Sequence, residues 1–135
     1  MYLTRVLLAI FFAGLLGTAA ELLLLEHFED ILQIIPFFVI ALGVAIGGWY
    51  ARRESPGSVR AFRAMLVLLA ISGVTGLVLH FRGNVEFAKE SDASLGGLEL
   101  IWEALMGATP ALAPGMMVFL AAIGYAITVA RAPAR

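Results

Sequence analysis

Residues 6–25 read VLLAIFFAGLLGTAAELLLL, an apolar run interrupted by a single charge, Glu21. A helix needs about 20 apolar residues to cross the hydrocarbon core of a bilayer. Residues 17–20 (GTAA) have the small side chains of a signal-peptide cleavage site, but the apolar run continues to Leu25, which favours a retained helix. This stretch therefore predicts a membrane span.

Three further stretches have the composition of spans, namely residues 31–50, 62–81 and 112–130. Backbone polar groups in lipid must be satisfied within their own segment, so helices are expected and not strands. The whole chain is 61% hydrophobic and 14% charged, with a mean hydropathy of +0.96. A soluble domain of 135 residues cannot bury so much apolar surface. We predict a single transmembrane domain over residues 1–135.

Other classes of protein are excluded by what the sequence lacks. There is no cysteine, so disulfides and thiolate metal sites are impossible. There is no basic tract with interleaved aromatic residues, so nucleic-acid binding has no support. The HExxH, GxSxG and Walker motifs are absent, and no nucleophile–base set can be assembled. We therefore expect no enzymatic activity.

The charged residues separate by sign between the two predicted sides of the membrane. Nine of the ten acids fall on one side with both histidines: Glu21, Glu26, Glu29, Asp30, Glu86, Glu90, Asp92, Glu99 and Glu103. Seven of the nine basic residues fall on the other side: Arg5, Arg52, Arg53, Arg60, Arg63, Arg131 and Arg135. The positive-inside rule places this basic side in the cytoplasm, with both termini. In a bacterium, the acidic side of this inner-membrane protein would face the periplasm.

The outer loop, residues 82–111, contains signals of its own. Arg82-Gly83-Asn84 is typical of a turn that ends the third helix. Ser94 is suited to cap a short amphipathic helix over residues 95–106, whose Trp102 favours the membrane interface. The predicted fold class is therefore an all-α integral membrane protein: a four-helix transmembrane bundle with a short interfacial helix before the fourth span.

Glycines recur at helical spacing within three of the spans: Gly14 and Gly17, Gly43 and Gly47, Gly73 and Gly76. Small residues let membrane helices approach closely, so these faces are expected to pack against protein. The central pair could serve the interior of the bundle or a dimer interface. The other two pairs share a face with Glu21 and His80, which predicts that these side chains meet at the outer end.

The candidate metal ligands are therefore Glu21, His80, His27 and Glu86. Imidazole and carboxylate groups together suit a divalent transition metal, and carboxylates inside a membrane are often functional. The residues expected to form a polar network around them are Arg82, Asn84 and Glu26. An arginine so close to the carboxylates would compete with a metal ion.

Three functions fit these observations. The first is a small non-enzymatic membrane protein whose outward-facing Glu/His pocket binds a metal cation or a proton. The second is a structural or accessory subunit of a larger membrane complex, with other membrane subunits or a second copy as its partner in the bilayer. The third is a small transporter that uses Glu21 as its coupling carboxylate, although the interior of the bundle offers few polar residues for a path.

Overall fold

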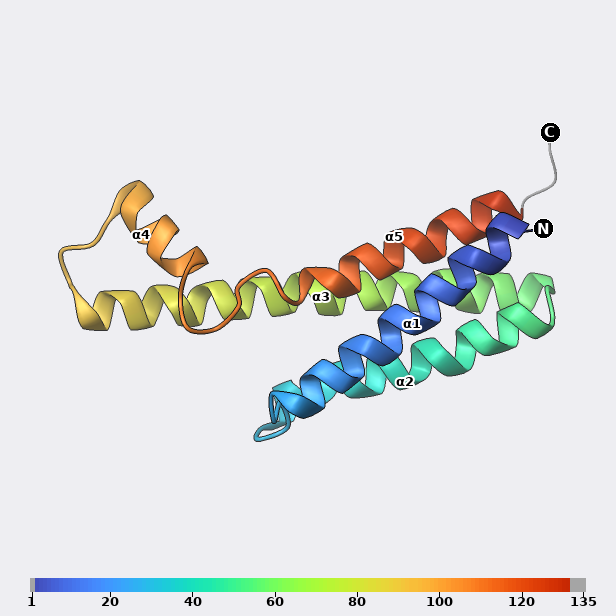
Figure 1. Cartoon of the computed structure of the whole chain (residues 1–135), viewed down its shortest axis with the longest axis horizontal. Helices are drawn as coiled ribbons and strands as arrows, with labels where there is room; N and C mark the ends of the chain where they lie inside the picture. The colour runs from blue at the N-terminus through green and yellow to red at the C-terminus, as the bar shows by residue number, and fades with distance from the viewer. Residues whose placement is uncertain (1, 132–135) are drawn as a thin grey trace.

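The computed structural model describes residues 2–131, and this part of the chain is entirely helical apart from its turns and loops (Figure 1). The helices are α1 (Tyr2–Leu24), α2 (Ile31–Arg52), α3 (Pro56–Ser91), α4 (Gly97–Leu105) and α5 (Gly115–Ala130). The first three are long and apolar enough to cross a membrane, while α5, with 16 residues, is apolar but shorter. The prediction of a helical, membrane-like chain is confirmed.

Four of the helices form a ring in which each packs on two neighbours. The neighbouring pairs are α1–α2, α2–α3, α3–α5 and α5–α1. The first residues of α1, the turn between α2 and α3, and the last residues of α5 all lie at one end of the molecule (Figure 1). The arginines that we assigned to the cytoplasmic side lie at this end, which we call the basic end. Arg135, the last of that set, lies outside the described residues.

Stacked aromatic rings hold the basic end together. The rings of Tyr50 and Phe62 stack with their centres 4.6 Å apart, and Phe11 meets Phe62 edge-on at 5.5 Å. The guanidinium group of Arg131 lies 4.8 Å from the centre of the Tyr50 ring and 3.6 Å from the carboxylate of Glu54. These contacts join α1, α2, α3 and the end of α5 in one core.

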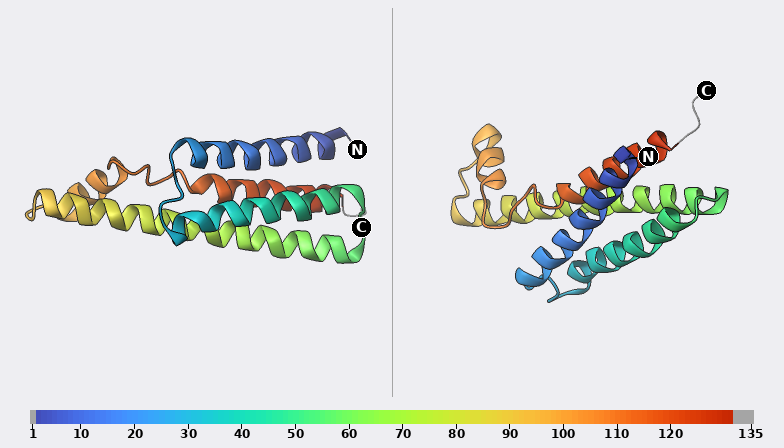
Figure 2. Two further views of the ribbon diagram at one scale, coloured as in Figure 1. Left: turned by 90° about the horizontal axis from the view of Figure 1, so that it is seen from below. Right: turned by 45° about the vertical axis from the view of Figure 1, so that its right-hand side comes forward.

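The helices separate toward the other end, where the hairpin of α1 and α2 leaves the axis of α3 (Figures 1 and 2). Leu15 is the last fully buried residue of α1, and the next glycine along, Gly17, has open space around it. Glu21 is exposed for the same reason. The expectation that the face of Gly17 and Glu21 packs against protein is therefore wrong, because α1 has already diverged at this level.

The other glycines of the three predicted pairs do mark close packing. A Cβ atom at Gly73 would lie 2.9 Å from the carbonyl oxygen of Pro114, so α5 begins directly against α3. Gly43 faces the side chains of Leu15 and Met65. Of the two uses considered for Gly43 and Gly47, the structure therefore supports packing inside the bundle of one chain.

The third helix is longer than predicted. The prediction of a turn at Arg82-Gly83-Asn84 is wrong, since α3 continues without interruption to Ser91. Its 36 residues extend for about 54 Å, far more than the roughly 30 Å hydrocarbon core of a bilayer. Glycine alone does not end a helix, and Asn84 uses its side chain for distant contacts. The third helix is therefore longer than a single span requires.

The short helix is present with different bounds. It covers residues 97–105 instead of 95–106, and its first turn follows Gly96, which contributes no capping side chain. Ser94 was expected to be the cap, but its backbone NH and hydroxyl both donate to Asp92. That local turn lowers the pKa of the exposed Asp92 carboxyl through the two bonds from Ser94. The helix starts later because Ser94 is already used in this turn.

Candidate functional site

His27 is positioned by the turn that ends α1. The backbone NH of His27 donates to the carbonyl of Leu22, and that of Glu26 donates to Leu23, at 2.9 and 3.1 Å. This pair of bonds defines a Schellman motif, whose reversing residue takes a left-handed conformation. That residue is Glu26, with a φ of 52°. The chain therefore reverses immediately after α1 and directs the following residues back toward the bundle.

The reversal brings His27 to His80 on α3. The centres of the two imidazole rings lie 6.0 Å apart, with the ring planes inclined by 58°. The pKa of His27 is lowered by burial and then by the positive charge of His80, which together outweigh the opposite effect of Asp30. His27 therefore favours its neutral form, in which one ring nitrogen carries a free lone pair.

His80 is oriented by a backbone carbonyl from far along the chain. Its Nδ1 atom lies 3.1 Å from the carbonyl oxygen of Pro110. A carbonyl oxygen can only accept, so the proton of this bond resides on Nδ1. When the ring is neutral, Nε2 is left with its lone pair. Histidines that bind metals are commonly oriented in this way, with the other ring nitrogen donating to a carbonyl or carboxylate.

Asn84, one turn further along α3, fixes the segment that holds Pro110. Its amide nitrogen donates to the carbonyls of Ala104 and Thr109, at 2.8 and 2.7 Å, and its oxygen accepts from the backbone NH of Thr109 at 3.3 Å. The side chain is buried. Asn84 therefore satisfies one of the free carbonyls at the end of α4 and anchors the loop that follows. Of the residues expected to form a polar network, only Asn84 is joined to distant parts of the chain, and its partners are backbone groups of Ala104 and Thr109.

The carboxylates do not join the two histidines directly. The carboxylate of Glu21 makes no ion pair or side-chain hydrogen bond with another of the described residues, although we expected it to meet His80. Glu86 pairs with Arg82 at 3.9 Å, one turn apart on α3, and both side chains are exposed. An exposed pair of this kind contributes little to stability. Glu26 is also exposed.

Between residues 2 and 131, no group of three His, Asp or Glu side chains is close enough to hold a metal ion. Of the ligand set predicted from the sequence, the structure thus brings together only the two imidazole rings. The partners of these histidines, Pro110 and Asp30, were not predicted as site residues. Both act through backbone or local charge, which leaves no distinctive sequence signal.

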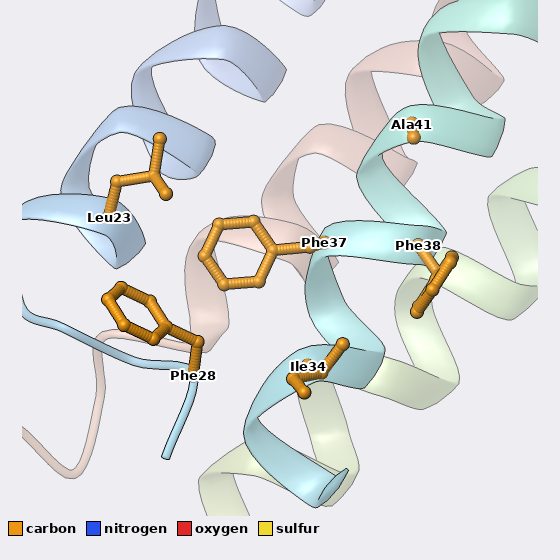
Figure 3. Close-up of a pocket in the computed structure, with 6 residues that line it drawn as sticks. All are labelled: Leu23, Phe28, Ile34, Phe37, Phe38 and Ala41. Carbon is orange, nitrogen blue, oxygen red and sulfur yellow. The ribbon is translucent and has the colours of Figure 1, made fainter. Parts of the chain in front are cut away.

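An open apolar groove lies beside the turn, where α1 and α2 separate (Figure 3). It has a volume of about 480 Å³ and is lined by Leu23, Phe28, Ile34, Phe37, Phe38 and Ala41. Phe28 directly follows His27 and contributes its ring to the groove (Figure 3). His27 therefore directly precedes a residue of this apolar surface at the end of the hairpin.

In comparisons with known proteins, no family model, no curated protein and no solved structure matches this chain.

Proposed function

We propose that the chain crosses the bacterial inner membrane four times, through α1, α2, the first part of α3 and α5, with both termini in the cytoplasm. The arginines at the basic end support this orientation. At 1.5 Å per residue α5 is about 24 Å long, so its flanking residues would have to complete the crossing.

In this arrangement α4 lies in the membrane interface. Asn84, which binds the end of α4, is three residues beyond Phe81, where the predicted span ends, and so about 5 Å above it. The interfacial layer is about 5 to 8 Å thick on each side of the hydrocarbon core. One side of α4 carries exposed apolar residues: Leu98, Ile101, Trp102 and Leu105. The acidic Glu99 and Glu103 lie on a different side, as expected for a helix in the membrane plane.

The function we propose is the binding of a divalent transition metal ion at the outer end of the bundle, without enzymatic turnover. The observation that carries this proposal is the approach of His27 and His80 from two separate segments. With each coordinating nitrogen about 2 Å from the ion, two ring centres lie roughly 5 to 6.5 Å apart. The observed separation of 6.0 Å falls in this range.

The environment of the pair supports a metal ion more than a proton relay. The carbonyl of Pro110 accepts from Nδ1 of His80, so Nε2 is the nitrogen with the lone pair whenever that ring is neutral, and the lowered pKa of His27 favours its neutral form. Neutral imidazole is the form that binds metals. Water would complete the coordination, and Asp30 is the carboxylate whose charge acts on His27. A site with two protein ligands is open and would exchange its ion readily.

Titration of the purified protein with zinc or copper tests this function. A ligand present at 100 times its dissociation constant stabilises the folded state by about 2.7 kcal/mol. We expect the metal to raise the unfolding temperature of the intact protein through this stabilisation. A chelator should reverse the rise, and the rise should be lost in His80→Ala and in His27→Ala. Glu90→Gln, at an exposed acid near the end of α3, is the matched control.

An unfolding temperature that changes neither with added metal nor with chelator would contradict metal binding. The role of an accessory subunit would then lead, and larger proteins that co-purify with the chain after gentle solubilisation would support it. The transporter alternative has no comparable support, because it requires a polar path through the bundle.

A further inference from the structure

A second groove runs between α3 and α5 in the half of the bundle nearest the basic end. Its volume is about 270 Å³, and it is lined by Arg63, Leu66, Val67, Ala70, Ala121 and Tyr125. The two helices pack tightly beneath it, because a Cβ atom at Gly124 would overlap the side chain of Leu66. Apart from Arg63 and Tyr125 at its rim, the lining is aliphatic.

The rim of this groove is positively charged. Arg63 is exposed and makes no ion pair with a residue of the described chain, and Arg60 lies one turn nearer the start of α3. The one acid in this part of the sequence, Glu54, is paired with Arg131. Among the described residues, no carboxylate therefore pairs with the guanidinium group of Arg63.

The two polar residues of the rim lie at similar depths. Arg63 is seven residues into α3, about 10 Å from its start, and Tyr125 is five residues before the end of α5, about 8 Å. Tyrosine and arginine favour the level of the lipid headgroups, where the apolar part of the side chain stays in the membrane. Arg63, Val67 and Ala70 follow one another along the same face of α3 toward the membrane centre.

We propose that this groove binds one anionic phospholipid from the leaflet at the basic end. The guanidinium group of Arg63 binds the phosphate, for which its planar fork is well suited, and the Tyr125 hydroxyl provides a further donor. An acyl chain packs against Leu66, Val67 and Ala70. A free phosphate ion would make no favourable contact with these aliphatic side chains, whereas a phospholipid would. Basic pockets between membrane helices bind anionic headgroups.

Native mass spectrometry of the intact protein in detergent tests the proposal, with phosphatidylglycerol and phosphatidylcholine added at equal concentration. We expect one phosphatidylglycerol to be retained in preference to phosphatidylcholine. A single arginine near an anionic lipid contributes enough to change affinity about fivefold, so Arg63→Gln should weaken retention by at least that factor. Arg5→Gln, an exposed arginine of the same end on α1, should change it by less than about twofold.

Val67→Trp fills the groove at an exposed position while leaving Arg63 in place, and it should also reduce retention. Equal retention of the two lipids would overturn the proposal. So would an Arg63→Gln protein that retains phosphatidylglycerol as the wild type does, or an equal loss in Arg5→Gln, which would indicate attraction by net charge alone. The groove lies at the opposite end from the histidines, so neither proposal depends on the other.

Discussion

The buried side chain of Asn84 lies directly against Gly107, where a Cβ atom would be 2.6 Å from Cγ of the asparagine. Only a residue without a side chain fits here. This contact allows the loop after α4 to fold down onto α3, so that Thr109 meets the asparagine and Pro110 meets His80. The orientation of one metal-ligand candidate thus depends on a packing contact one turn away.

Asn84→Ala should destabilise the outer unit formed by α4 and the end of α3. The change leaves the carbonyls of Ala104 and Thr109 and one backbone NH without their partner. Loss of a partner to a buried polar group costs about 1–3 kcal/mol. Faster limited proteolysis between α3 and α4 would reveal the effect. Ser91→Ala, which removes a local bond on the exposed end of α3, is the control and should cleave at the wild-type rate.

Glu26→Gly should stabilise the protein. A side chain in the left-handed conformation costs about 1–2 kcal/mol, which glycine avoids. The unfolding temperature in detergent should therefore rise for this variant. Glu29→Gly removes an equivalent charge from the same turn, at a residue outside the left-handed region. The unfolding temperature of this control variant should not rise. If both variants behave alike, the effect comes from charge and not from the backbone.

The stability of the metal-free protein should fall as the solution becomes acidic. Burial and His80 hold the pKa of His27 below its ordinary value of 6.5. In the unfolded chain the ring protonates near 6.5, so below this pH the unfolded state binds more protons than the folded state. Stability therefore decreases from pH 6.5 downward, until the folded pKa of His27 is passed. Chelator-treated His27→Gln should show a flatter profile, and an unchanged profile would contradict this assignment.

The orientation in the membrane can be tested by labelling single cysteines in whole cells. We predict that a cysteine at Glu54, between α2 and α3, is protected from an impermeant thiol reagent, while one at Ser91 reacts. Both positions are exposed, whereas Ser58 is fully buried in the capping box with Ser55 at the start of α3 and would be a poor reporter. The reverse pattern of labelling would place the basic end outside the cell.

The sequence predicted the helical elements more reliably than their ends. Long apolar runs predict helices that are long enough to cross a membrane, because length and hydropathy suffice, as in α1 and α2. The continuation of α3 through Gly83 was not predicted, since local turn signals outweighed a contact between Asn84 and Thr109, 25 residues apart. Contacts of this kind have no local signature.

The candidate site was predicted in part. Both histidines were selected by their residue type and their predicted side of the membrane. The predicted contact, however, was between Glu21 and His80, not between the two histidines. The position of His27 depends on the left-handed Glu26, where a helix of this kind usually ends in glycine. A glycine there would have signalled the turn, and with it the approach of His27 to His80.

X-ray absorption of the copper-loaded protein tests the central claim most directly, because scattering from imidazole rings counts the histidines bound to the ion. We predict two imidazoles in the wild type, one in His27→Ala and in His80→Ala, and none when both are replaced. A wild-type spectrum that contains only oxygen ligands, or one that is unchanged by either substitution, would contradict the claim that His27 and His80 bind a metal together.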